Sequence, residues 1–314
     1  MVEISYVQAI VIGILQGITE LFPISSLGHS VLLPAWLGGD WAALVTQYGT
    51  DDSSQSPYLA FIVALHVATA IALLLFYWRD WVAIITAGFT TIRTRSVTTS
   101  TERLAWLIVI ATIPVGITGL VLEHSFRVLF AKPAAAAMFL TLNGVILLAG
   151  ERLRRRSDAR AAAETLDASA SLAADHERRR AVVGGTRRSL DNLSYLEAAV
   201  IGAFQTFALL AGISRSGITM VGGLVRGLDH EDALKFSFLL ATPVILAAGL
   251  FKIPTLAGPA GDGIHGQVIV GAIAAGLAAY ASVRFLTRYF TTRTLTPFAI
   301  YCLVVGTASL IKFI

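Results

Sequence analysis

Residues 9–30 read AIVIGILQGITELFPISSLGHS, and residues 198–219 read AAVIGAFQTFALLAGISRSGIT. A shift of 189 residues aligns the two stretches, and the residues that then coincide include Gly13 with Gly202, Gln16 with Gln205, Ser25 with Ser214 and Gly28 with Gly217. Each stretch starts apolar and is interrupted by Gly, Pro or Ser, which predicts two short helices meeting at a break. The chain therefore contains an internal repeat built on a broken helical hairpin.

The composition around these hairpins is that of an integral membrane protein. Hydrophobic residues make up 55% of the 314 residues, charged residues 14%, and the mean hydropathy is +0.72. Crossing a hydrocarbon core of about 30 Å takes roughly 20 mostly apolar residues. Segments of that kind occur at 58–78, 105–123, 134–150, 233–251, 266–283 and 296–313. The single cysteine, Cys302, excludes a disulfide framework and a cysteine-based metal site.

The expected fold is an all-α membrane protein with six transmembrane helices and two re-entrant helical hairpins. The first repeat, 1–150, contains hairpin 4–38 and three crossings, and the second repeat, 194–314, contains hairpin 194–228 and three crossings. Between them, 151–193 is rich in arginine and reads as a solvated loop with room for a helical stretch. Because three crossings are an odd number and a re-entrant hairpin returns to its own side, the second repeat is predicted to be inverted.

Positive charges orient this topology. The central loop and the segments on its side of the membrane carry nineteen Lys and Arg residues, against four on the other side. The positive-inside rule then places the loop in the cytoplasm and both termini outside the plasma membrane. The two hairpins consequently enter the membrane from opposite faces.

Polar residues concentrate at the hairpin breaks, where ionisable side chains at membrane depth indicate function. The candidates in the first hairpin are Gln16, Glu20, Ser25, Ser26, Gly28 and His29, and in the second Gly212, Ser214, Arg215, Ser216, Gly217 and Thr219. Arginine and two helix N-termini suit a phosphate group. A serine, a neighbouring base and a guanidinium together favour phosphoryl transfer.

Other interpretations of the same residues stay open. Single serines often bond the carbonyl four residues back, and Glu20 with Arg215 could form a structural ion pair between the repeats. His66 is interpreted as a packed, hydrogen-bonded interior residue. Inverted repeats with broken helices are also typical of transporters, so a secondary transporter or lipid flippase is the main alternative, followed by an inactive phospholipid-binding protein.

The motifs "QGITE" (16–20), "PISSLGH" (23–29) and "GISRSG" (212–217) resemble those of the BacA/UppP family of undecaprenyl-diphosphate phosphatases. The resemblance implies hydrolysis of a polyprenyl diphosphate at a site open to the extracytoplasmic face, which recycles the lipid carrier for cell-envelope glycans. It also implies that Ser26 is the nucleophile, Glu20 a catalytic or metal-associated carboxylate, His29 an acid or base, and Arg215 the diphosphate ligand.

Two positions depart from the family pattern: Gln16 stands where many members have glutamate, and Leu27 replaces a commonly hydroxylated residue. The family is linked to Mg2+ or Ca2+, so a divalent cation is expected, with Glu20 as its ligand. The expected partners are the polyprenyl diphosphate and the bilayer, with no nucleic acid. The oligomeric state is open, a homodimer included.

Overall fold

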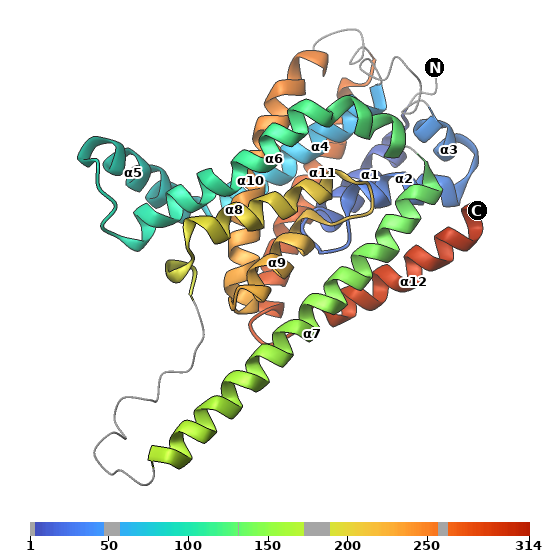
Figure 1. Cartoon of the computed structure of the whole chain (residues 1–314). Helices are drawn as coiled ribbons and strands as arrows, with labels where there is room; N and C mark the ends of the chain where they lie inside the picture. The colour runs from blue at the N-terminus through green and yellow to red at the C-terminus, as the bar shows by residue number, and fades with distance from the viewer. Residues whose placement is uncertain (1–3, 47–56, 131, 173–188, 257–262) are drawn as a thin grey trace.

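The computed structural model describes residues 4–46, 57–130, 132–172, 189–256 and 263–314, and these ranges are helical apart from turns (Figure 1). In chain order the elements are α1 (Tyr6–Thr19), α2 (Ser26–Leu37), α3 (Gly39–Thr46), α4 (Pro57–Phe76), α5 (Trp78–Thr94), α6 (Ser100–Phe130), α7 (Pro133–Leu172), η3 (Leu190–Asn192), α8 (Tyr195–Phe204), η4 (Gln205–Leu209), α9 (Arg215–Val225), α10 (His230–Leu256), α11 (His265–Tyr289) and α12 (Thr296–Phe313).

Each region predicted to be broken holds short helices on either side of the break, α1 and α2 in the first and α8, η4 and α9 in the second, and the two regions start in the same way. Ser5 and Gln8 make a capping box at the start of α1, and Ser194 and Glu197 make one at the start of α8. In both boxes the serine Oγ accepts from the backbone N–H three residues on, at 3.2 Å. These caps lie 189 residues apart, so the repeat seen in the sequence extends to local structure.

The predicted crossings correspond to the long helices. Within the described ranges, five helices (α6, α7, α10, α11 and α12) are long and apolar enough to cross a membrane. The segment predicted at 58–78 differs, because α4 ends at Phe76 and the chain turns by 85° into α5. With α4 and α5 taken together as one broken span, the structure holds up to six crossings.

The boundary predicted at residue 150 falls inside a helix, because α7 continues without a break through the arginine-rich segment to Leu172 (Figure 1). The sequence there is rich in alanine and arginine, which are good helix formers. Pairs one turn apart add support, with Glu151 and Arg155 at 3.1 Å and Arg154 and Asp158 at 3.4 Å. The described part of this segment, residues 151–172, is therefore the helical stretch for which the prediction left room.

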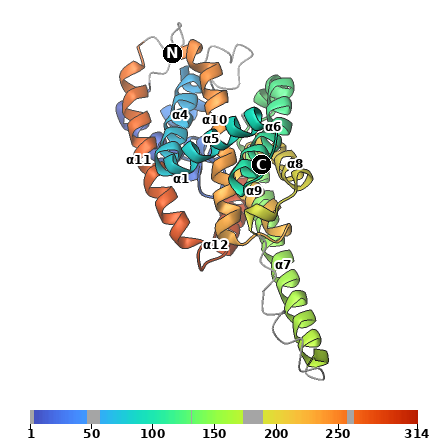
Figure 2. The same ribbon diagram turned by 90° about the vertical axis from the view of Figure 1, so that its left-hand side faces the viewer.

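The two halves of the chain interlock. Helix α1 packs on α11 of the second half, and α8 packs on α6 of the first, on opposite sides of the molecule (Figure 2). Equivalent glycines allow both contacts: a Cβ on Gly13 would meet the backbone of Gly271, and one on Gly202 would meet the backbone of Ala111. This packing brings the two hairpin tips together in the interior, where α4 and α10 also meet.

Candidate active site

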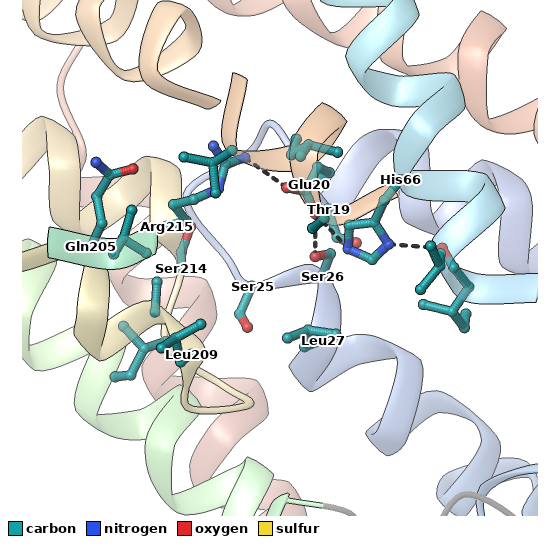
Figure 3. Close-up of a pocket in the computed structure, with 18 of the residues that line it drawn as sticks. Thr19, Glu20, Ser25, Ser26, Leu27, His66, Gln205, Leu209, Ser214 and Arg215 are labelled. Carbon is teal, nitrogen blue, oxygen red and sulfur yellow. Dashed lines mark hydrogen bonds and ion pairs between the residues drawn. The ribbon is translucent and has the colours of Figure 1, made fainter. Parts of the chain in front are cut away.

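A cavity of about 260 Å3 lies between the two hairpin tips (Figure 3). Its polar side chains come from the hairpins and one residue of α4: Thr19, Glu20, Ser25, Ser26, His66, Gln205, Ser214 and Arg215. Its apolar walls come largely from α4, α6 and α10, with Ile62, Val63, Val115, Val244, Ile245 and Ala248. The cavity therefore offers a polar centre beside hydrocarbon-like surface.

The carboxylate of Glu20, at the C-cap of α1, is the centre of the polar network. Its Oε1 accepts a charge-assisted hydrogen bond from Arg215 Nη2 at 2.7 Å. Its Oε2 accepts from Ser26 Oγ at 2.5 Å and from Gln16 Nε2 at 3.1 Å, and lies 3.3 Å from His66 Nε2. Residues from both hairpins thus converge on one buried acid, as the sequence predicted for Gln16, Glu20, Ser26 and Arg215.

Ser26 and Arg215 occupy equivalent positions in the repeat, because each is the first residue of the helix that follows a break. The preceding residues, Ser25 and Ser214, cap these helices by accepting from Gly28 N at 3.3 Å and Gly217 N at 3.1 Å. The N-termini of α2 and α9 therefore lie next to Glu20, with their positive dipole ends toward the site. Arg215 Nη1 is buried and has no hydrogen-bond partner among the described residues, so this donor remains available for an anion.

Hydrogen bonds to Ser25 connect the two helix breaks. Its Oγ accepts from Gly212 N at 3.1 Å as well as from Gly28 N. Ser25 has φ 72°, a left-handed conformation that costs a non-glycine residue energy and is found at functional sites. A Cβ on Gly28 would lie 2.9 Å from Gly212 Cα, so only glycine permits this approach.

Asn143 of α7, which is not among the sequence candidates, also joins the tips. Its Nδ2 donates to Pro23 O at 3.0 Å, and its Oδ1 accepts from Ser214 N at 3.0 Å. The side chain is fully buried. The sequence signal that could have identified Asn143 is a single amide side chain within an apolar span, because such a polar group is costly in a membrane unless it has a specific partner.

His29 lies outside the cavity lining. Its Nδ1 bonds Ser25 O at 2.7 Å, its Nε2 bonds Tyr301 Oη at 2.8 Å, and its ring stacks on that tyrosine. In this arrangement both ring nitrogens have partners within the fold. The acid or base role expected for His29 stays a prediction.

The remaining predicted residues of the second hairpin support the backbone around the site. Ser216 Oγ bonds Phe22 O at 3.2 Å, and Thr219 Oγ1 donates to Arg215 O at 2.8 Å. Gly217 faces Leu147 and Pro23 closely, so it serves packing as well as the cap. Of the second hairpin's candidates, Ser214 and Arg215 line the cavity, and these others do not.

Three polar residues of the cavity, Thr19, His66 and Gln205, were not among the sequence candidates. His66 was interpreted as an interior histidine, and its Nδ1 does bond Ile62 O at 2.8 Å, but its Nε2 faces Glu20. Gln205 was noted only as the repeat equivalent of Gln16. Its Nε2 donates to Ala111 O at 3.3 Å, and its buried Oε1 has no partner in the described chain. The missed signal for His66 was an ionisable side chain inside a predicted span.

The residues of the site do not fit a resident divalent cation. Within the described ranges no group of three or more His, Cys, Asp or Glu side chains is placed to hold a metal ion. Glu20 is the cavity's carboxylate, and both its oxygens face nitrogen or hydroxyl groups of neighbouring side chains. Mg2+ in enzyme sites is usually held by one or two carboxylates together with substrate phosphates and water, so the single carboxylate of this cavity suits a cation that arrives with a phosphate substrate better than one held by the protein alone.

Comparison with known proteins agrees with the motifs. The family model described as bacitracin resistance protein BacA matches residues 9–308. Undecaprenyl-diphosphatase 2 of Frankia alni is 62% identical, over 99% of this chain and 98% of that protein. Undecaprenyl-diphosphatase of Mycolicibacterium paratuberculosis is 58% identical over 98% and 97%, and that of Granulibacter bethesdensis 42% identical over 97% and 95%. The chain belongs to the bacitracin resistance protein BacA family.

Proposed function

We propose that this protein is a membrane phosphatase that hydrolyses undecaprenyl diphosphate to undecaprenyl monophosphate and inorganic phosphate, recycling the lipid carrier of cell-envelope synthesis. The observation that carries the proposal is the hydrogen-bonded set Ser26–Glu20–Arg215 in a cavity with apolar walls. A hydroxyl, a carboxylate at 2.5 Å and a guanidinium at 2.7 Å from that carboxylate are the groups that serine attack on phosphorus requires.

The proposed reaction has two steps. Ser26 Oγ attacks the terminal phosphorus, its proton passes to Glu20, and the bond from that phosphorus to the bridging oxygen breaks, releasing prenyl monophosphate. Water then attacks the phosphorus of the phosphoserine, and the bond between that phosphorus and Ser26 Oγ breaks. Glu20 returns its proton to Ser26 Oγ. The released phosphate keeps one hydrogen of the water, and the other leaves as a proton. Arg215 bonds the phosphate oxygens through Nη1 and keeps Nη2 on Glu20.

The apolar walls indicate the class of substrate. A diphosphate alone would be served by the polar residues, whereas Val63, Val115, Val244 and Ile245 offer surface for the first isoprene units of a lipid tail. A transporter would also need donors for the anion, but it would not need a serine hydroxyl held 2.5 Å from a carboxylate. The geometry therefore favours hydrolysis over transport.

We propose the inverted topology with re-entrant hairpins and an extracytoplasmic opening. The hairpin helices α1, α2, α8 and α9 have 10 to 14 residues, fewer than the roughly 20 that a crossing takes. With the central arginine-rich segment in the cytoplasm, the N-terminal part of α4 and the C-terminal part of α10 lie in the outer half of the membrane. The cavity residues Ile62 to His66 and Val244 to Gly249 belong to those parts, which supports an outward opening.

The tail contact can be tested with the purified protein. We expect rapid phosphate release from a C15 or C55 prenyl diphosphate. For a diphosphate without a prenyl chain, kcat/KM should be at least about 100-fold lower, because each buried CH2 contributes about 0.8 kcal/mol to binding. A malachite green phosphate assay measures both. Equal rates for the two substrates would contradict the assignment of the apolar walls to the tail.

For the divalent cation expected from the family, we propose that it arrives on the diphosphate, whose oxygens supply the ligands that the protein lacks. A chelator should then lower phosphate release and added Mg2+ or Ca2+ should restore it. Calorimetric titration of the lipid-free protein with Mg2+ should show no stoichiometric binding. Binding at micromolar concentration without lipid would instead indicate a resident site.

A further inference from the structure

His66 reaches the acid of the proposed phosphatase from a part of the fold outside both hairpins. It lies on α4 and lines the cavity, and its side chain is 18% exposed, against 6% for Glu20. Its Nε2 is 3.3 Å from Glu20 Oε2, the oxygen that also accepts from Ser26 and Gln16. Figure 3 shows His66 and Arg215 on opposite sides of Glu20.

The hydrogen bonds fix where the protons of His66 lie. Nδ1 is 2.8 Å from Ile62 O, and because a carbonyl only accepts, Nδ1 carries a hydrogen. Nε2 then faces a carboxylate oxygen, and two facing lone pairs would repel each other. The contact between His66 Nε2 and Glu20 Oε2, at 3.3 Å, is therefore favourable when one of the two groups holds a proton.

The residue at position 16 also contacts the oxygen of Glu20 that faces His66. Gln16 contacts the same oxygen at 3.1 Å, but an amide cannot take up or release a proton there. An ionisable group could be placed against Glu20 Oε2 from either position, from α1 at residue 16 or from α4 at residue 66. In this chain the ionisable group comes from α4.

We infer that His66 is the positioning residue of the reaction: it orients Glu20 toward Ser26 and provides the second proton-holding group that Gln16 cannot provide. The inference rests on the proposed phosphatase reaction. It differs from the role expected for His29, whose ring nitrogens bond Ser25 O and Tyr301 Oη away from Glu20.

The test is an exchange of the two positions. We expect His66→Gln to lower kcat about 100-fold, the range of acid–base assistance, while KM changes less than about threefold. The double variant Gln16→Glu/His66→Gln should have a kcat at least about tenfold higher than that of His66→Gln, because it returns an ionisable group to Glu20 Oε2. The matched control is Gln205→Glu/His66→Gln: Gln205 is the repeat equivalent of Gln16 and lines the cavity, but its amide bonds Ala111 O and not Glu20.

The outcomes separate the two claims. Wild-type kcat in His66→Gln, or equal recovery from the carboxylates at positions 205 and 16, would overturn the role of His66. If His66→Gln does not purify as a folded protein, the Gln16→Glu/His66→Gln variant decides: turnover within about tenfold of wild type supports the exchange, and turnover as low as that of Glu20→Gln overturns it. Absence of phosphate release by the wild-type protein would overturn the phosphatase function itself.

Discussion

Replacing Arg215 by alanine is expected to lower phosphate release from prenyl diphosphate by about 100- to 1,000-fold in kcat, the loss typical of removing a group that stabilises developing charge. Arg215 is the only lysine or arginine among the described residues that line the cavity. Its Nη1 has no partner in the described chain and is the donor that the terminal phosphate would take. The alanine variant therefore loses the charge and the hydrogen bonds together.

Two further variants make this measurement specific. Arg215→Lys keeps a positive charge but loses the planar two-nitrogen fork, and we expect a loss of about tenfold, between wild type and alanine. Arg226→Ala removes an exposed arginine at the other end of α9 and should leave the rate unchanged. Turnover of Arg215→Ala within about threefold of wild type would mean that another group holds the phosphate.

Replacing Ser26 by alanine is the second large effect. If Ser26 Oγ forms the phosphoserine, its removal should lower kcat at least about 100-fold. The change deletes one hydroxyl and leaves the other contacts of Glu20 with Gln16, His66 and Arg215 in place. Binding of the prenyl diphosphate should persist, so the substrate should still protect the variant against heat.

Ser30 supplies the matched control for Ser26. It lies one turn further along α2 and is also buried, and its Oγ has no partner in the described part of the chain. Ser30→Ala should therefore keep the wild-type rate. Near-normal turnover of Ser26→Ala would remove the phosphoserine step and leave direct attack by water, with Glu20 as its base.

Much of the site could be predicted from the sequence because it is local to the repeat. The breaks at Ser25 and Ser214, the i, i+4 pair of Gln16 and Glu20, and the meeting of Glu20 with Arg215 follow from the two hairpins, and the structure places these groups together. The Glu20–Arg215 pair that could have been purely structural lies in the wall of the cavity, together with Ser26.

The contributions of the long helices could not be predicted in the same way. In an apolar span, composition does not show which side of the helix faces the interior, so neither Asn143 on α7 nor His66 on α4 could be assigned a partner. The 85° turn after α4 has no Pro or Gly at its break, so no local sequence signal marks it. The full length of α7 was not predicted, because the span was expected to end at residue 150 and the arginine-rich continuation was expected only to have room for a helical stretch.

The most direct test of the account follows undecaprenyl diphosphate in vesicles that contain the purified protein. The wild-type protein should convert it to equal amounts of undecaprenyl monophosphate and inorganic phosphate, and Arg215→Ala vesicles should retain the diphosphate. Chromatography of the lipid and a phosphate assay on the same sample measure both products. Intact diphosphate moved to the opposite leaflet by the wild-type protein, with no phosphate released, would contradict the phosphatase function and establish transport instead.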